Sequence, residues 1–247
     1  MVTISTVLVA QNLVERGYPF VESIFSVAPF SSEIIIVEGY STDDTLAWLE
    51  KLQKRIPKIK IIRADFEKDS HWLANMRNTG IQACKGDYIW GGDIDEVLPE
   101  GSEKLIFMAI KKFPDRDAFL FPHLHFIYDF NTIRANPGYV FGHHLFKNNG
   151  NVESIGEGTW KGGENQICVD APVIFHYGYV FKQATQNKLA NHKALYPHWN
   201  MERVYGNMVK TIPYDGPHPQ SIQRLIARLQ GGDYQPFLED KYYGEAA

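Results

Sequence analysis

Three carboxylates, Asp93, Asp95 and Glu96, lie close together directly after Gly91 and Gly92. Carboxylates this close repel one another unless a cation lies among them. Alternate side chains of an extended chain share a face, so Asp93 and Asp95 can point into one pocket. Glycines remove side chains where a ligand must come close. The stretch therefore favours a divalent-metal and nucleotide-diphosphate site, and a solvated acidic turn is the alternative.

The elements that must position this stretch alternate between strand and helix patterns. Strands are expected over 4–10, 33–37, 60–63 and 87–90, and helices over 18–27, 45–54 and 73–84. This alternation predicts an α/β fold with a right-handed, mostly parallel sheet flanked by helices. Ligands bind such sheets at the carboxyl ends of the strands. Glu38, Asp93 and Asp95 follow such ends, which predicts that they meet at one edge of the sheet.

The pattern changes after about residue 115. Further strands are expected over 117–126, 138–147 and 172–177, and helices over 182–195 and 221–229. Residues 150–163 are rich in Gly, Glu and Asn, which is typical of a functional loop. Residues 231–247 are expected to form a loosely packed tail. Because there is no internal repeat or linker, the sequence predicts one domain over 1–247, in which 116–247 form a smaller mixed region.

The bulk composition excludes several classes of protein. The chain has 247 residues, 44% of them hydrophobic, and a net charge of −4, which gives no electrostatic footprint for nucleic acid. There is no signal-peptide pattern, and no apolar run approaches the about 18 residues of a transmembrane segment. Cys84 and Cys168 are expected to be reduced and buried. The sequence predicts a cytoplasmic protein, with peripheral attachment to a membrane as an open alternative.

Glu38 follows a strand and precedes a Ser/Thr/Asp helix cap at 41–45. A carboxylate there can accept a hydrogen bond from the imide N–H of uracil or from a ribose hydroxyl. The alternative is that the stretch is simply a well-capped turn between a strand and a helix.

Two blocks of the sequence together resemble a known family. Residues 34–45 place Glu38-Gly39-Tyr40-Ser41-Thr42-Asp43 after a strand, and residues 75–95 place Arg77-Asn78-Thr79-Gly80 before a strand that ends in Asp93-Ile94-Asp95. In order and spacing they resemble the family 2 glycosyltransferases, in which a strand ends in Asp-Asp-Gly-Ser-Thr-Asp and Arg-Asn-x-Gly precedes Asp-x-Asp. The resemblance covers about the first hundred residues. It implies the nucleotide-sugar-binding GT-A fold, with 1–115 as the nucleotide-sugar-binding half and 116–247 as the acceptor-side half.

The resemblance also implies roles for individual residues. Asp95 would bind Mn²⁺ or Mg²⁺, Asp93 would contact ribose or metal, and Glu38 would contact the base. The other donor residues that it implies are Val9, Ala10 and Gln11 beside the base, Asp43, and Arg77 near the base or the phosphates. A UDP-sugar is favoured as donor, and a GDP-sugar is the alternative. Glu96, one position after the metal pair, is expected to face the acceptor side or solvent.

The second half is similar to bacterial lipopolysaccharide-core glycosyltransferases, in which a strand ending in His-Tyr precedes a helix that bears lysines. The corresponding residues are His176-Tyr177, followed by Lys188 and Lys193. The similarity implies that His176 completes the metal site begun by Asp95, and that Lys188 covers the diphosphate. A hydrogen-bonded structural histidine is the alternative for His176.

An inverting transfer needs a base for the acceptor hydroxyl. The loop 150–163 offers Glu157 and Glu153, and Glu157 matches similar sequences better. Trp160 is predicted to stack on a sugar ring. His123 and His125 share a strand face and are predicted to line the acceptor cleft. For each of these residues an ordinary surface or core role is the alternative.

Together these features predict a metal-dependent, inverting glycosyltransferase with Mn²⁺ or Mg²⁺ as cofactor. It would move a sugar from a nucleoside-diphosphate sugar to a saccharide, lipid-linked or protein acceptor. A retaining enzyme of the same fold, a nucleotidyltransferase that makes nucleotide sugars, and a nucleotide-sugar-binding module without catalysis are the alternatives. Residues 8–13 lack the glycine-rich loop of nucleotidyltransferases, and the intact Asp93 and Asp95 pair disfavours the binding module.

Overall fold

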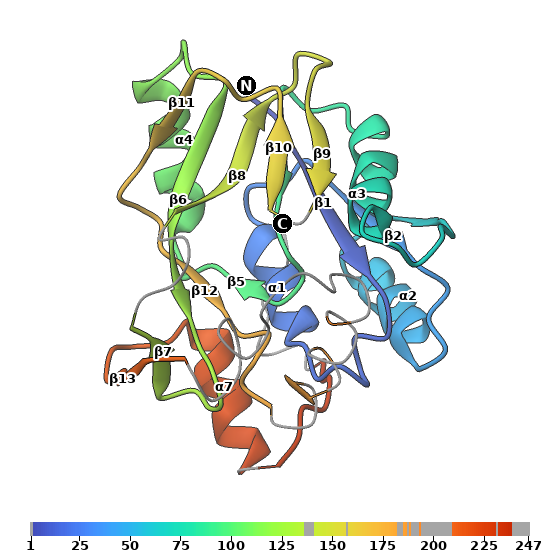
Figure 1. Cartoon of the computed structure of the whole chain (residues 1–247), viewed down its shortest axis with the longest axis vertical. Helices are drawn as coiled ribbons and strands as arrows, with labels where there is room; N and C mark the ends of the chain where they lie inside the picture. Colours follow the sequence, from blue (N-terminus) through green and yellow to red (C-terminus); the bar gives the residue numbers. More distant parts are fainter. Residues whose placement is uncertain are drawn as a thin grey trace.

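A computed structural model of the chain describes residues 2–135, 141–156, 158–181, 185–186, 188, 193, 209–230 and 232–238. Its centre is a nine-stranded sheet with helices on both faces (Figure 1). The strands of this sheet are β1 (Ile4–Ala10), β2 (Glu33–Glu38), β3 (Ile59–Arg63), β4 (Tyr88–Gly91), β5 (Glu96–Val97), β6 (Ala118–His125), β8 (Phe141–Lys147), β11 (Gln166–Cys168) and β12 (Ile174–His176). The helices are α1 (Phe20–Val27), α2 (Thr45–Arg55), α3 (Trp72–Gln82), α4 (Ser102–Lys112) and α7 (Gln220–Leu229).

The strand order is β3-β2-β1-β4-β8-β6-β12-β5, and β11 pairs with β6. The first four strands are parallel, whereas β8 runs antiparallel between β4 and β6. This mixed but mostly parallel sheet confirms the predicted α/β class. Strands from both sides of residue 115 share the sheet, and the proposed division of the chain at that residue stays a prediction.

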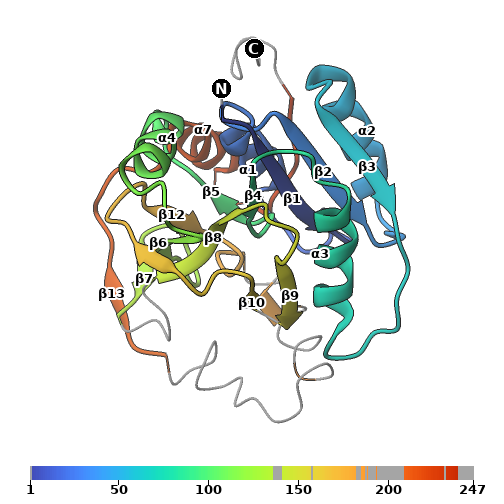
Figure 2. The same ribbon diagram turned by 90° about the horizontal axis from the view of Figure 1, so that it is seen from above.

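Alternate residues of β2 pack into different layers of the core. Ile34 and Ile36 lie in the apolar cluster that includes side chains of α1, α2, α4 and α7. Ile35 and Val37 lie in the other cluster, with side chains of α3. Figure 2 shows α3 on one side of the sheet, and α1, α4 and α7 on the other. Both faces of the strand are therefore covered, which explains its unbroken apolar run.

Two short sheets complete the described part of the chain. β9 (Glu153–Gly156) pairs with β10 (Thr159–Lys161), and β7 (Thr132–Arg134) pairs with β13 (Thr211–Pro213). The stretch 150–163, expected as a loop, thus contains paired strands. They are packed against α3 because Asn78 hydrogen-bonds to the backbone of Ser154.

Two expectations about the C-terminal part of the chain have different outcomes. Of the helix expected over 182–195, the structure describes residues 185, 186, 188 and 193 only, and these are helical. In the expected tail, Tyr234 is buried, with its ring 6.0 Å from that of Phe20 and its hydroxyl 3.1 Å from Glu22 Oε2. The prediction of loose packing was therefore wrong for Tyr234, because an aromatic ring with a buried partner for its hydroxyl packs stably.

Within the described parts of the chain, every helix is too short or too polar to span a bilayer.

The two cysteines lie in different environments, so the prediction that both are buried was wrong. Cys168 is exposed on the edge strand β11. Cys84 is partly covered, and its Sγ lies 3.3 Å from the carbonyl oxygen of Gly80. Burial raises the pKa of the Cys84 thiol to about 12.

Native protein treated with iodoacetamide near pH 8 should therefore be alkylated at Cys168 and not at Cys84. The thiolate is the reactive species, and the raised pKa of Cys84 leaves almost none of it at that pH. Peptide mass spectrometry before and after unfolding measures both sites, and the variant Cys168→Ser should remain unlabelled until it unfolds. Rapid alkylation of Cys84 in the native Cys168→Ser variant would contradict this assignment.

Gly80 sets how closely α3 packs on the sheet. A methyl group at this position would lie 2.5 Å from Val7 Cγ1 and 3.1 Å from Val37 Cγ2. Valine side chains are stiff, so the helix itself must move to relieve the contact.

We expect Gly80→Ala to lower the free energy of unfolding measured by urea denaturation. Overpacking costs about 1–3 kcal/mol, which outweighs the gain in helix propensity of at most about 1 kcal/mol. Gly156→Ala is the matched control, because a methyl group at Gly156 meets no atom within 4 Å. Equal stability of the two variants would show that α3 is free to shift away from β1.

Candidate active site

The three carboxylates that follow β4, of which Glu96 begins β5, point to different partners. Asp93 pairs with Arg77 of α3, Asp95 with Lys188, and Glu96 with His144 of β8. Each negative charge has its own cationic or imidazole partner, and this resolves the repulsion that the sequence implies.

Asp95 lies buried at the centre of this group. Its Oδ2 is 2.9 Å from Lys188 Nζ and 3.5 Å from His176 Nε2. Burial alone would raise the pKa of Asp95, but the charges of Lys188 and His176 outweigh it and hold this pKa well below its usual value. The Asp95 backbone also accepts a hydrogen bond from the N–H of Tyr177, which fixes the turn against β12. Asp95 is therefore an ionised carboxylate beside an imidazole and an ammonium group.

Arg77 connects α3 with the acidic turn. Its guanidinium donates to Asp93 Oδ1 and, at 3.5 Å, to the carbonyl oxygen of Gly156. The same guanidinium lies 5.3 Å from the centre of the Trp160 ring, within the range of a cation–π contact. Arg77 is almost fully buried, whereas 45% of the Asp93 side chain is exposed. Asp93 is thus the most solvent-exposed of the three carboxylates.

The remaining residues of the Arg-Asn-x-Gly block have structural roles. Asn78 donates to the carbonyl oxygen of Ser154 at 2.9 Å and accepts from its N–H at 2.8 Å. Gly80 allows α3 to lie against β1. Residues within a single turn of α3 thus hold Asp93, the strand β9 and the sheet.

Gly91 and Gly92 have a different role from the one the sequence suggested. A methyl group at Gly91 would lie 2.6 Å from the Trp160 ring, and one at Gly92 would lie 2.8 Å from Trp90 Nε1. In this structure both glycines make room for indole rings of the same chain, and the predicted close approach of a ligand stays a prediction. Trp160 also packs on the Phe146 ring at 4.8 Å, and its proposed stacking on a sugar stays a prediction.

Glu38 ends β2 and is fully buried. Its carboxylate accepts from the N–H of Ser41 at 2.6 Å and of Tyr40 at 3.2 Å, and from Arg63 Nε at 2.9 Å. These contacts fit the capped-turn alternative, and the predicted contact of Glu38 with the base is untested.

The ends of β1 and β2 are tied to each other around this turn. Gln11 Nε2 donates to the carbonyl oxygen of Gly39, and the Asn12 carboxamide oxygen accepts from the N–H of Thr42. Asp43 accepts from the N–H groups of Glu15 and Thr45, and so helps to cap α2. Val9 and Ala10 pair with Val37 and Glu38 in the parallel register. The predicted donor residues of β1 and β2 therefore share one edge of the sheet.

Tyr40 stands where the motif of the family has glycine. Its φ of 51° lies in the left-handed region, which costs a non-glycine residue about 1–2 kcal/mol. The exposed Tyr40 ring stacks on the Arg63 guanidinium, with 4.0 Å from Cζ to the ring centre. The cation–π contact offsets part of that cost.

The residues predicted for acceptor and base chemistry are placed as follows. Glu157 lies outside the residues that the structure describes. Glu153 is exposed, and its Oε2 lies 3.3 Å from Lys161 Nζ. His123 and His125 are both buried, and His125 Nδ1 lies 3.1 Å from His176 Nδ1.

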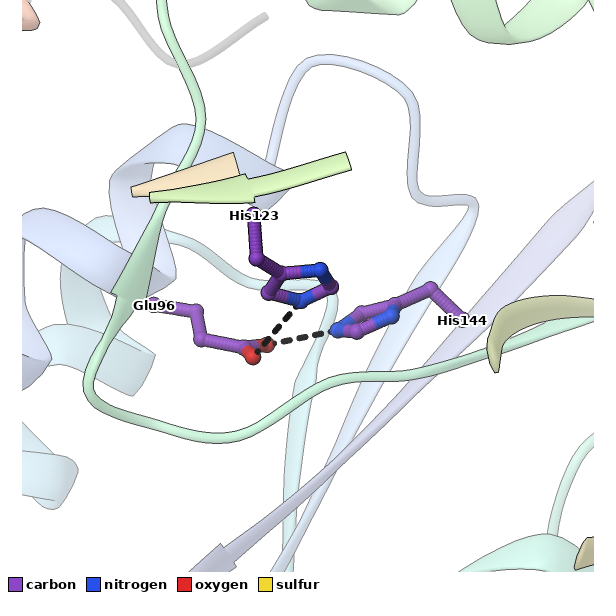
Figure 3. A group of neighbouring side chains, drawn as sticks. All are labelled: Glu96, His123 and His144. Atoms are coloured by element: carbon purple, nitrogen blue, oxygen red, sulfur yellow. Dashed lines mark hydrogen bonds and ion pairs between the residues drawn. The ribbon is translucent and has the colours of Figure 1, made fainter. Parts of the chain in front are cut away.

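The donor set at Asp95 suits a divalent cation. Adjacent ligands of an octahedral Mg²⁺ or Mn²⁺ ion lie about 3 Å apart, close to the 3.5 Å between Asp95 Oδ2 and His176 Nε2. A carboxylate and an imidazole are both suitable ligands. Asp93 is not grouped with these two residues, because its carboxylate is held by Arg77. In the described part of the chain, the one group of three possible ligands within 4.8 Å is Glu96, His123 and His144 (Figure 3).

Glu96 is the residue whose role the sequence analysis missed. The expectation that it faces the acceptor side or solvent was wrong, because it is only 7% exposed. Its Oε1 lies 3.3 Å from His123 Nε2 and its Oε2 lies 2.7 Å from His144 Nε2. The alternate spacing of His123 and His125 was a partial signal, but His144 is brought in only by the pairing of β8 with β6.

Comparison with known proteins decides the family. A family model described as Glycosyl transferase family 2 matches residues 12–165, which is more than half of the chain. The chain belongs to glycosyl transferase family 2. A search of curated protein sequences finds no match.

Solved structures of Staphylococcus aureus TarS have a similar fold. The crystal structure of TarS 1–349 matches with a TM-score of 0.52 and 12% identity over 78% of this chain and 66% of TarS 1–349. The complex of TarS 1–349 with UDP-GlcNAc gives 0.54 and 12% over 78% and 65%, and the complex with UDP gives 0.53 and 12% over 83% and 73%. This chain thus spans just under two thirds of the first of these structures. The likeness confirms the GT-A-like architecture of this glycosyltransferase.

We expect Asn78→Ala to lower the free energy of unfolding by about 1–3 kcal/mol, since it leaves the buried N–H and C=O of Ser154 without their partner. Asn75→Ala on the exposed face of the same helix is the matched control. Urea denaturation of both variants measures the difference, and similar losses in the two would show that β9 does not depend on the Asn78 carboxamide.

Proposed function

We propose that this glycosyltransferase moves a sugar from a UDP-sugar to a hydroxyl acceptor by metal-dependent, inverting displacement. The observation that supports it most is the buried Asp95 carboxylate beside His176 and Lys188, at the end of a family 2 Asp-x-Asp turn. The fold shared with TarS structures that contain UDP-GlcNAc and UDP supports uridine diphosphate as the carrier. A GDP-sugar is the alternative donor.

The electrostatics of the site suit a diphosphate leaving group. Lys188 Nζ is held over the Tyr179 ring at 4.2 Å while it pairs with Asp95. The aromatic ring keeps the ammonium group in place when a phosphate oxygen replaces the carboxylate as its partner. Arg77 supplies a second, nearly buried cation on the other side of the turn. These two cations would stabilise the negative charge that develops on the departing nucleoside diphosphate.

Asp95 and His176 are the residues that would hold the metal. A bound Mn²⁺ or Mg²⁺ ion supplies further neutralisation of charge on the leaving diphosphate. His125 Nδ1 lies 3.1 Å from His176 Nδ1, so it can accept a hydrogen bond from an Nδ1–H of His176 and favour the tautomer in which His176 Nε2 is unprotonated toward Asp95. Asp93, exposed beside Arg77, is then available for the ribose.

For the acceptor we propose Glu157 as the base that takes the proton of the attacking hydroxyl. Glu153 is the second candidate, but its pairing with Lys161 on the surface disfavours it. The attack breaks the bond from the anomeric carbon to the diphosphate oxygen and inverts the anomeric centre, because the base and the leaving group lie on opposite faces of the sugar. The acceptor is a saccharide, lipid-linked or protein hydroxyl, and the enzyme acts in the cytoplasm or at a membrane surface.

We expect Asp95→Asn to lower the Mn²⁺-dependent transfer rate by about 100-fold or more, because charge stabilisation by a metal contributes several kcal/mol. Asp115→Asn, an exposed carboxylate before β6, is the matched control. Circular dichroism checks that both variants are folded. A folded Asp95→Asn variant with the wild-type rate would sink the site assignment.

Donor hydrolysis distinguishes an enzyme from a module that only binds nucleotide sugars. The wild-type chain is incubated with UDP-glucose, UDP-GlcNAc and GDP-mannose, each with Mn²⁺ or EDTA, and released nucleoside diphosphate is measured. We expect release from a UDP-sugar that requires Mn²⁺. Tight binding without any release would favour the binding module, and proton NMR of the first-formed product distinguishes inversion from retention.

A further inference from the structure

A second group of possible metal ligands lies directly behind the acidic turn. Glu96 of β5, His123 of β6 and His144 of β8 converge from three strands (Figure 3). All three side chains are buried, and their ligand atoms lie within 4.8 Å of one another. None of these residues is needed by the proposed transfer reaction, so the group requires a separate explanation.

The contact between His123 and Glu96 has a specific chemical problem. His123 Nδ1 lies 2.9 Å from the carbonyl oxygen of Phe121, and because a carbonyl only accepts, Nδ1 carries a proton. In the neutral ring, Nε2 therefore presents a lone pair. That lone pair faces Glu96 Oε1 at 3.3 Å, where two acceptors oppose each other. A cation between them removes the repulsion.

His144 approaches the other oxygen of the same carboxylate. Its Nε2 lies 2.7 Å from Glu96 Oε2. Burial by itself would lower the pKa of His144, but Glu96 outweighs this effect and raises it. Without a metal, a proton on His144 satisfies Oε2 only, and the opposed acceptors at Oε1 remain.

The backbone makes room for the two imidazoles to converge. A methyl group at Gly142 would lie 2.6 Å from His123 Cε1 and 3.1 Å from His144 Cε1. Any larger residue at this position would therefore force one of the rings away from Glu96.

We propose that Glu96, His123 and His144 bind a divalent transition-metal ion, with Zn²⁺ as the fitting species. Two imidazoles and one carboxylate form a ligand set known for zinc, and the edge of its tetrahedron is about 3.3–3.5 Å. The distance from Glu96 Oε1 to His123 Nε2 matches this edge, and the proton of His144 Nε2 leaves when the metal binds. The Nδ1–H of His123 donates to a backbone carbonyl, as the second ring nitrogen of zinc-bound histidines usually does.

The ion holds the turn that carries Asp93 and Asp95 against the sheet. Glu96 Oε2 accepts from the N–H of Asp93 at 2.9 Å, and Glu96 directly follows Asp95. A metal at Glu96 therefore links both carboxylates of the donor site to β6 and β8. Since none of its ligands is shared with Asp95 and His176, this site can be tested whether or not the chain transfers sugars.

The test uses the full chain, stripped with a chelator and titrated with Zn²⁺ and with Co²⁺. Four proteins are compared: the Asp95→Asn variant, which removes the donor-site carboxylate, and the same variant combined with Glu96→Gln, with His144→Gln or with His143→Gln. His143 is the matched control, because its Nε2 bonds to Gln166 and not to Glu96. We expect stoichiometric zinc, a raised melting temperature and visible Co²⁺ absorption bands in the first and last proteins. Zinc affinity should fall at least about tenfold with Glu96→Gln and with His144→Gln.

Glu96→Gln separates a metal site from a hydrogen-bonded network. A glutamine amide can donate to His123 Nε2, so a hydrogen-bonded network without a metal should keep its stability in the Glu96→Gln protein. In that case zinc would not change the melting temperature of the parent protein, which carries Asp95→Asn alone. An unchanged melting temperature of the parent with zinc, or unchanged zinc affinity in the folded Glu96→Gln protein, would overturn the proposal. If both Gln variants fail to fold, the parent protein decides: stoichiometric zinc with Co²⁺ bands supports the site, and their absence overturns it. Sugar transfer is measured separately, so a negative zinc result leaves the proposed function unaffected.

Discussion

Burial of two adjacent carboxylates is the constraint on which the arrangement of this site depends. Asp95 and Glu96 are both almost completely buried, and a buried charge must be paired or neutralised. Asp95 ends the turn and Glu96 begins β5, and their partners come from different elements. Lys188 and His176 serve Asp95, whereas His123 and His144 serve Glu96. The short strand β5 is therefore held between two sets of cationic or imidazole groups.

These partners also connect the two carboxylates to each other. The rings of His144, His123, His125 and His176 form a row, with successive centres 4.8, 5.5 and 5.1 Å apart. Burial keeps the pKa of His125 well below its usual value, so the middle of the row is uncharged near neutral pH. The uncharged His125 ring thus lies between His123, a partner of Glu96, and His176, a partner of Asp95.

The glycines and aromatic residues near the turn show how a motif can be explained within the protein itself. Gly91 is required by the Trp160 ring, and Trp160 in turn lies beside the Arg77 guanidinium that holds Asp93. The residues of a short motif can thus be required by the packing of side chains distant in sequence as well as by the binding of a ligand. Three residues of the family 2 block on α3 have separate contacts. Arg77 forms an ion pair with Asp93, Asn78 hydrogen-bonds to the backbone of β9, and Gly80 lets the helix lie against β1.

By itself, the sequence determined the α/β architecture, the family and the placement of Glu38, Asp93 and Asp95 at strand ends, because hydrophobic periodicity and motif spacing are local properties. Only the tertiary structure decided what these carboxylates contact. Insertion of β8 between β4 and β6 brings His144 to Glu96, and residue 188 reaches Asp95 across 93 positions of sequence. Local patterns contain no information about which strands pair across such separations. The partners of a buried charge are fixed by the fold as a whole, where the cost of leaving that charge unpaired selects them.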